Sequence, residues 1–252
     1  MTQLLNNLTT LKTMSEYFYI PAEYILDQHV AIEGEEARHI SRVLRKQPGD
    51  LIWIVDGAGK AYEVVIRLVA PEMIECEILY EHHHHHEPDI EVTLAVAQLK
   101  NPSRMDWVIE KATELGVRTI IPLQTTRTIS RSPKEDRWNN IAIAAMKQSG
   151  RCILPKVLPP MDFSDVVANS SQYDFKLIPY ERTDHVLFIA EALKHRKPPR
   201  SVLIVIGPEG GFTDEEIMQA EKSEFIQVSL GRRRLRTETA AIISVGWVVG
   251  NE

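Results

Sequence analysis

The feature that most constrains the fold is an alternation of apolar runs and helical patterns that begins near Ile90 and continues to the last residues. The apolar runs have strand length and read IEVTLAVAQ, VRTIIPL, FKLIPY, SVLIVI and IQVSL. Helices are predicted at Pro102 to Leu115, Arg137 to Ser149, Phe163 to Ala168, His185 to His195, from Thr213 onward, and at Thr237 to Val249. Strands that alternate with helices pair in parallel, so residues 90–252 are predicted to form an α/β domain with a parallel sheet covered on both faces.

Residues 16–81 show a different pattern. Short apolar runs, FYI, LIWIVD, AYEVVIRLV and IECEILY, are separated by turn sequences at residues 48–50 and 56–59, which predicts a small antiparallel β-rich domain. A helix is predicted over Glu35 to Lys46, with Arg42 and Arg45 among its exposed basic residues. Residues 1–15 are polar and are expected to be a frayed arm or an overlong start.

A run of five histidines, His82 to His86, ends the β-rich part. It has no apolar periodicity, and residues 82–89 are therefore predicted to be a solvated linker between the two domains. Histidine-rich tracts can hold a transition metal, but adjacent histidines lack the spacing of a zinc site. We therefore expect no metal.

Composition limits the classes of protein. Of 252 residues, 44% are apolar and 25% charged, which is typical of a globular protein and not of a disordered one. Two cysteines cannot build a disulfide framework, and no apolar stretch approaches the ~20 residues of a membrane span. A cytoplasmic protein without a membrane partner is expected. The net charge of −6 means that any polyanionic partner must be met by a local basic patch.

The sharpest local signal is a glycine-rich turn after the apolar run that ends at Ile206. It reads Gly207-Pro208-Glu209-Gly210-Gly211-Phe212, and Thr213 with Glu216 forms a capping box for the next helix. Ligands of open α/β sheets bind at the carboxyl ends of the strands, where this turn lies. The turn is neither a Walker A loop nor a G-x-G-x-x-G motif, and Glu209 would repel phosphate. A cationic or neutral ligand fits better, although the glycines could serve the turn alone.

The second signal is the segment from Leu230 to Ala240, which reads LGRRRLRTETA. It contains four arginines and leads into an apolar helix that must be buried. Four guanidinium groups cannot all enter the core unpaired, so they mark either a solvated face or a surface that binds a polyanion.

Together these motifs resemble the RsmE family of SPOUT methyltransferases, which methylate N3 of a uridine in 16S ribosomal RNA with S-adenosylmethionine. The resemblance rests on IGPEGGFTDEE followed by LGRRRLRTETAAI, and on KATELGV, RW and QSGR in the segment between Asp106 and Arg151. The N-terminal segment HISRVLR with Gly49-Asp50 and Asp56-Gly57 is similar to the family's RNA-binding module. Two departures are Lys147, where the family usually has Glu, and Glu16, where an arginine is usual.

The resemblance implies a fold and partners. The C-terminal part would be a SPOUT-type sheet with a trefoil knot, and the N-terminal part a small PUA/OB-like β-barrel. The protein would act on 16S ribosomal RNA or the small ribosomal subunit, as a homodimer, with S-adenosylmethionine and no metal. Cofactor binding would fall to three strand ends, at Leu177, Pro179, Ile206, Gly207, Glu209, Gly210, Gly211, Leu230, Gly231, Leu235, Arg236 and Thr237.

For catalysis, Arg236 is expected to stabilise the uracil anion, and Glu238 is one candidate for the proton acceptor. RNA contacts are expected from Arg42, Arg45, Arg127, Arg131, Lys147 and Arg151. Two other functions remain open on the residues alone. One is a non-catalytic RNA-binding protein with a degenerate methyltransferase domain. The other is a nucleotide hydrolase or kinase, which would lack the lysine and metal ligands of phosphoryl transfer.

Overall fold

The chain forms two compact units in the computed structural model, which describes residues 16–129, 134–181, 187–194 and 199–250. The first unit holds the described residues up to His86 together with Lys147–Ile153. The second holds Glu87–Met146 and the residues from Leu154 onward. The sequence predicted a division at residues 82–89, but it did not predict that residues 147–153 join the first unit.

The first unit is built on a six-stranded curled sheet. Its strands follow the spatial order β1 (Tyr17–Tyr19), β4 (Leu51–Val55), β5 (Lys60–Val69), β6 (Met73–His83), β3 (His29–Glu33) and β2 (Ile25–Leu26). All neighbours are antiparallel except β1, which pairs in parallel with β4. Alternate residues of these strands, such as Ile32, Ile54 and Ile66, are fully buried and form one core.

The helix predicted over Glu35 to Lys46 is shorter than expected. Helix α1 covers Gly34–Arg38, and a wider π-type turn continues it over His39–Val43. The chain then leaves the helical path, because Arg45 has a positive φ of 54°. Arg42 and Arg45 are nevertheless both exposed.

The histidine run is not a solvated linker in its first part. His82 and His83 belong to β6, and the His82 Nε2 lies 2.9 Å from the Glu63 carboxylate. The ring of His85 stacks on Trp53 at 4.7 Å between centroids, and its Nε2 lies 3.1 Å from the Tyr17 hydroxyl. Ring packing against the sheet therefore overrides the polar character of the run.

This packing predicts a pH-dependent stability. Burial, and then the neighbouring His86 and His82, hold the pKa of His85 below its ordinary value of 6.5. A lowered imidazole pKa means that the folded state binds fewer protons, so its contribution is complete above pH 6.5 and is lost as the pH falls through the folded-state pKa. Urea denaturation between pH 7.5 and 5 measures this slope. His85→Gln is expected to reduce the slope, and an unchanged slope in this variant would contradict the role of His85.

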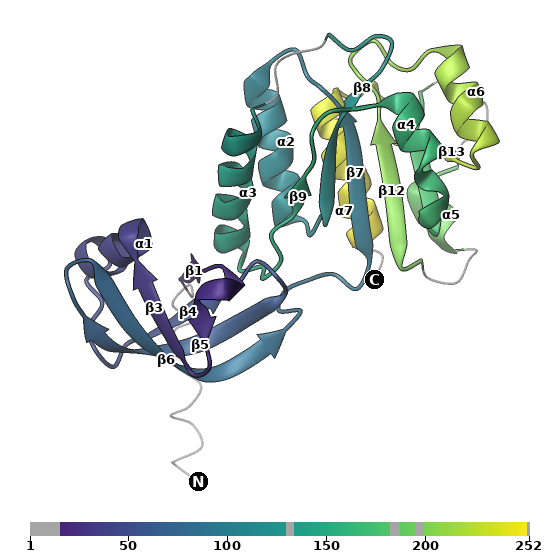
Figure 1. Ribbon diagram of the computed structural model, residues 1–252. Coiled ribbons are helices and arrows are strands. Elements are labelled where there is room, and N and C mark those ends of the chain that lie inside the picture. The colour runs from purple at the N-terminus through teal and green to yellow at the C-terminus, as the bar shows by residue number, and fades with distance from the viewer. Residues whose placement is uncertain (1–15, 130–133, 182–186, 195–198, 251–252) are drawn as a thin grey trace. The chain divides into compact units, whose positions relative to one another are not determined.

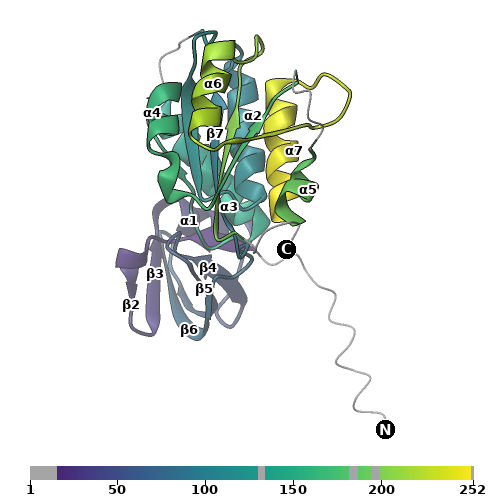
Figure 2. The ribbon, with the colours of Figure 1, turned by 90° about the vertical axis from the view of Figure 1, so that its right-hand side faces the viewer.

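The second unit is a parallel α/β sheet with helices on both faces (Figures 1 and 2). Its spatial order is β10 (Met161–Asp162), β8 (Thr119–Gln124), β7 (Glu91–Ala97), β12 (Ser201–Ile206), β11 (Phe175–Pro179) and β13 (Ile226–Val228), with β9 (Lys156–Val157) also paired to β8. Every strand pair is parallel. The carboxyl ends of β11, β12 and β13 therefore meet at one edge.

Two apolar cores fill the space between this sheet and its helices. One face is covered by α2 (Pro102–Glu114), α3 (Glu135–Ser149), α5 (Ile189–Lys194) and α7 (Thr237–Val249), and the other by α4 (Phe163–Ala168) and α6 (Asp214–Lys222). Successive residues of β12 serve both: Ile204 packs into the first core and Val205 into the second. This explains why its sequence is apolar throughout.

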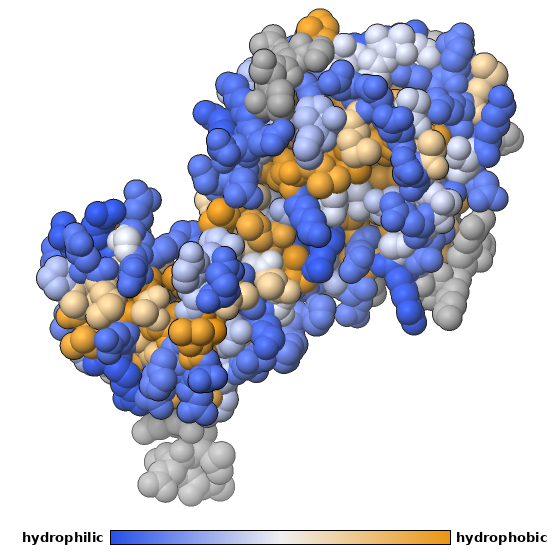
Figure 3. Space-filling view, viewed as in Figure 1, coloured by the Kyte–Doolittle hydropathy of each residue, from blue (hydrophilic) through white to orange (hydrophobic). Residues whose placement is uncertain are grey.

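The predicted elements of the second unit agree closely with the structure. The predicted capping box is present, because the Thr213 hydroxyl accepts from Glu216 N and the Glu216 carboxylate accepts from Thr213 N. The helix predicted at His185 to His195 lies partly outside the described residues. The trefoil knot stays a prediction. The face drawn in Figure 3 is largely hydrophilic, with apolar side chains in separate groups.

Candidate functional site

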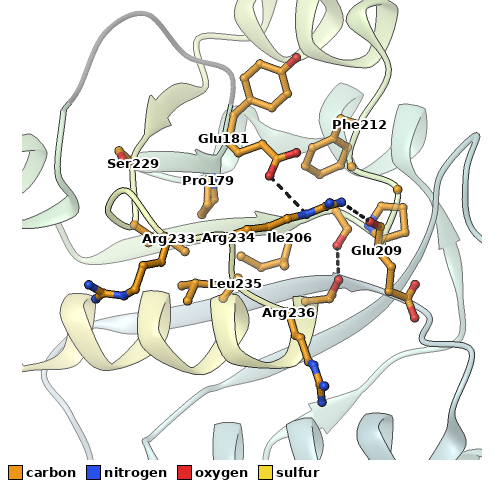
Figure 4. A pocket seen from close by; sticks show the side chains of 18 of the residues that line it. Pro179, Glu181, Ile206, Glu209, Phe212, Ser229, Arg233, Arg234, Leu235 and Arg236 are labelled. Atoms are coloured by element: carbon orange, nitrogen blue, oxygen red, sulfur yellow. Dashed lines mark hydrogen bonds and ion pairs between the residues drawn. The ribbon is translucent and has the colours of Figure 1, made fainter.

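A cavity of about 460 Å³ lies at the carboxyl edge of the parallel sheet in the second unit (Figure 4). Turns that follow β11, β12 and β13 form most of its wall, and α2 and the segment after β8 each contribute one arginine. The lining residues are Arg104, Arg127, Pro179, Tyr180, Glu181, Ile206, Gly207, Pro208, Glu209, Gly210, Gly211, Phe212, Ser229, Leu230, Gly231, Arg233, Arg234, Leu235, Arg236, Thr237 and Ala240. The cavity therefore lies where an open α/β sheet binds its ligand.

The glycine turn after β12 is held by contacts with Phe212 and the start of α7, and at Gly207 they leave no room for a side chain. A Cβ atom on Gly207 would approach the buried Phe212 ring to 3.0 Å. The carbonyl of Gly207 accepts a hydrogen bond from the Thr237 hydroxyl at 3.1 Å, which joins this turn to the start of α7. Gly211 has a φ of +69°, which favours glycine. These glycines therefore bring main chain close to the cavity.

Arg127 supports the same turn from a distant part of the sequence. Its Nη1 donates to the carbonyls of Gly210 at 2.7 Å and Phe212 at 3.1 Å. The sequence predicted an RNA contact for Arg127, but the structure shows that one nitrogen of its guanidinium already serves the glycine turn.

Arg234 connects the three turns around the cavity. Its Nε lies 3.7 Å from the Glu181 carboxylate after β11, and its Nη2 donates to the Glu209 carbonyl at 3.4 Å (Figure 4). Arg233 and Arg236 extend away from this pair in other directions. The Arg234–Glu181 pair is well exposed, so its contribution to stability is small.

Arg104 and Glu238 form a second ion pair beside the cavity. Arg104 lies in the first turn of α2, Glu238 lies in the first turn of α7, and the Arg104 Nη1 is 3.5 Å from the Glu238 Oε1. Arg104 lines the cavity. Glu238 does not, because it is 9% exposed and lies behind the arginine. The side chain chosen from the sequence as a proton acceptor is therefore set back from the cavity.

The predicted cofactor residues come together with one exception. Leu177 is fully buried in the core on the α7 side of the sheet and does not line the cavity, because its strand position faces the helices. The other eleven line it. Sequence reasoning missed Tyr180, Phe212, Ser229 and Arg104. The position of Arg104 in the first turn after β7 was the available signal, since that turn also starts at the carboxyl edge.

The predicted RNA-binding residues have different environments. Arg42 and Arg45 are exposed in the first unit. Lys147 forms an ion pair with Glu36 in the same unit. Arg151 is only 2% exposed, so the prediction that it contacts RNA does not fit its burial in the core. Arg131 lies outside the described residues.

Two features, a metal-binding cluster and a membrane-spanning helix, are absent from the described residues. No cluster of three or more His, Cys, Asp or Glu side chains is arranged to hold a metal ion. Within the same residues, no helix has the length and apolar character needed to cross a bilayer.

The β unit and the parallel sheet with its cavity each correspond to a domain found in RNA methyltransferases. Residues 86–249 match the family model of the RNA methyltransferase domain, and residues 32–79 match that of the RNA methyltransferase PUA domain. The first match covers more than half of the chain and spans the second unit together with residues 147–153 of the first, whereas the second match lies within the first unit.

Curated relatives identify the family within the class of RNA methyltransferases. Ribosomal RNA small subunit methyltransferase E of Mesomycoplasma hyopneumoniae is 37% identical over 71% of this chain and 77% of its own. The Bacillus subtilis protein of that name is 29% identical over 85% of this chain and 87% of its own. The chain belongs to the ribosomal RNA small subunit methyltransferase E family.

Solved structures show the same architecture. The Neisseria gonorrhoeae methyltransferase E, crystallised with S-adenosyl methionine, has a TM-score of 0.80 and 33% identity, and the match covers 92% of this chain and 95% of the other. A Legionella pneumophila protein in complex with the same cofactor has a TM-score of 0.77 and 32% identity over 93% and 96% of the two chains. The second unit therefore has the SPOUT-type fold that the sequence motifs predicted.

Proposed function

We propose that this protein methylates N3 of a uridine in 16S ribosomal RNA, with S-adenosylmethionine as methyl donor. The observation that carries the proposal is the cavity between the glycine turn and the arginine-rich turn. A relative with the same fold and 33% identity was crystallised with this donor. The lining includes two carboxylates, Glu181 and Glu209, among five arginines, so the identity of the donor rests on this relative and not on the charge of the cavity.

The lining residues fit S-adenosylmethionine. Pro179, Ile206, Leu230 and Leu235 give the apolar surface that an adenine ring requires, and the volume lies in the range of small-molecule sites. Glu181 and Glu209 bring negative charge to the same cavity. When bound, the donor supplies a methyl group attached to a positively charged sulfur. The sulfur is a good leaving group because it becomes a neutral thioether.

The chain's own residues have two tasks. They align the acceptor base with the methyl group, and they stabilise the uracil anion that forms when N3 loses its proton. Arg236 lines the cavity, which is consistent with the proposal that it is one of the cations near that anion.

RNA binding is proposed for the exposed basic residues of the first unit. Arg42→Ala with Arg45→Ala is expected to weaken RNA binding and to reduce the slope of log affinity against log salt by about 2, since each phosphate contact contributes about 0.9. Filter binding at several salt concentrations measures this slope. Arg67→Ala is the matched control, because Arg67 is exposed but paired with Glu77 at 2.7 Å. An unchanged slope in the double variant would remove these two arginines from the RNA interface.

We propose that the protein is active as a homodimer in the cytoplasm. Ile243 and Trp247 expose apolar surface on α7, and Trp247 is 55% exposed. A second copy covering this helix would bury that surface. Sedimentation velocity at micromolar concentration tests the dimer, and a single monomeric species would contradict it.

The enzymatic proposal is tested with small ribosomal subunits from a strain that lacks this protein. We expect incubation with the protein and labelled S-adenosylmethionine to introduce one methyl group, which mass spectrometry of nucleosides should identify as 3-methyluridine. A methyl group on another nucleoside would contradict the site of transfer. RNA binding without donor binding in calorimetry would instead favour a non-catalytic RNA-binding protein.

A further inference from the structure

The pair of Arg104 and Glu238 separates two roles that the sequence could not distinguish. α2 and α7 pack against each other on one face of the sheet, and the pair joins their first turns. Helix N-termini carry partial positive charge, which disfavours a cation such as Arg104 in the first turn of a helix. The Glu238 carboxylate offsets this positive charge. Glu238 is therefore well placed to hold a cation at this end of the two helices.

The geometry of Glu238 does not suit a proton acceptor. A general base must come within about 3 Å of the proton that it removes, directly or through one water. Glu238 does not line the cavity, and its Oε2 is completely buried without a hydrogen-bond partner among the described residues. Its Oε1 faces Arg104. The carboxylate thus acts on the arginine rather than on a ligand in the cavity.

Arg104, in contrast, reaches the cavity with a large part of its guanidinium unused by the pair. Its side chain is 36% exposed, and a guanidinium has five N–H donors, of which one nitrogen faces Glu238. A small shift of its planar fork would also satisfy the buried Oε2, since the fork matches a carboxylate. The carboxylate behind it therefore fixes the orientation in which Arg104 presents its remaining donors.

Two other arginines of the cavity, Arg127 and Arg234, already have partners in the surrounding turns. Arg127 and Arg234 donate to carbonyls of the glycine turn, and Arg234 also pairs with Glu181. Arg233 and Arg236 are exposed residues of the turn before α7, and Glu209 lies in the glycine turn. Among the described residues that line the cavity, Arg104 is the arginine that forms an ion pair with the first turn of α7.

We propose that Arg104 is a catalytic residue that stabilises the anionic uracil, and that Glu238 is its positioning residue. The inference rests on the proposed uridine methylation. N3 gives its proton to water, and the negative charge spreads to the neighbouring carbonyl oxygens, where Arg104 donates a hydrogen bond. The N3 electron pair then forms the bond to the methyl carbon, while the electron pair of the sulfur–carbon bond stays on sulfur.

The first experiment measures single-turnover methylation of small subunits by Arg104→Gln between pH 7 and 10, at saturating donor. We expect a loss of about 100-fold at pH 7.5, as for removal of one donor to a developing anion. Because the cation lowers the pKa of the bound uracil, the rising limb of the pH profile should move up by at least about one unit, with activity partly recovered at high pH. Donor affinity should stay within about twofold.

Two further variants distinguish loss of the Arg104 cation from a general loss of folding. Arg104→Lys keeps a cation beside Glu238 and should show a smaller loss and a smaller shift of the rising limb. Arg137→Gln is the matched control. Arg137 of α3 pairs at 2.7 Å with Asp106 of α2, the helix that also carries Arg104, but Arg137 does not line the cavity. This variant should leave the rate and the pH profile unchanged.

Glu238→Gln distinguishes positioning from proton transfer. We expect a loss of about tenfold with the rising limb retained, and little further loss when it is combined with Arg104→Gln, since both act through one guanidinium. Complete inactivity with a flat pH profile, or additive losses, would overturn the positioning role. An unchanged rate and profile in Arg104→Gln would overturn the catalytic role. If the unmodified protein itself makes no 3-methyluridine, the proposed function fails instead.

Discussion

Gly231→Val is expected to lower the affinity for S-adenosylmethionine by about 100-fold or more. Gly231 lines the cavity with a φ of +105°, a backbone conformation that a β-branched residue cannot adopt without strain of about 1–3 kcal/mol. The turn between Leu230 and Leu235 must therefore change its path, and two apolar lining residues move with it. Isothermal titration calorimetry with the donor measures the effect.

Gly49→Val is the matched control for this substitution. Gly49 has a φ of +98° and, like Gly231, no atom within 4 Å of the position that a Cβ would take. It lies in the first unit, far along the sequence from the cavity turns. Both variants should lose a similar amount of stability, but only Gly231→Val should lose donor binding. Equal donor affinities in the two variants would show that the turn at Gly231 takes no part in the site.

Glu216→Ala is expected to lower the free energy of unfolding by about 3 kcal/mol. The Glu216 carboxylate is nearly buried and accepts two main-chain hydrogen bonds of 2.8 Å, from Thr126 N and Thr213 N. Hydrogen bonds to a charged group contribute about 1.5–3 kcal/mol each, and alanine leaves both N–H groups without their acceptor. Urea denaturation measures the loss.

Two further variants in α6 show whether the loss of stability comes from the Glu216 carboxylate. Glu216→Gln keeps one acceptor oxygen and should lose about half as much, while Met218→Ala, at an exposed position of the same helix, should lose less than about 0.5 kcal/mol. Glu216→Ala should also weaken donor binding, because Thr126 adjoins Arg127, which holds the Gly210 carbonyl. A loss below about 1 kcal/mol would mean that water replaces the carboxylate without cost.

Much of the second unit could be predicted from the sequence because its signals are local. The capping box at Thr213 and Glu216 lies within four residues, and the short, β-branched apolar run over Ser201–Ile206 is typical of a strand buried on both faces. The strand ends then place the glycine turn and the arginine-rich turn at one edge. In the first unit local signals were weaker, and the helix after Gly34 ends earlier than its apolar spacing suggested.

The fold class and the positions of the glycine turn and the arginine-rich turn could be read from the sequence, since they follow from periodicity and continuous motifs. The cofactor residues were implied by the resemblance to a family, and eleven of the twelve line the cavity, while their role stays a proposal. Only the tertiary structure decided what each charged side chain does. Arg151 is buried, Arg127 supports the glycine turn, and Arg104 is joined to Glu238 across 134 positions of sequence. The physical reason is that the partner of a charge is set by the packing of helices and turns that are distant in the chain, and no local pattern records it.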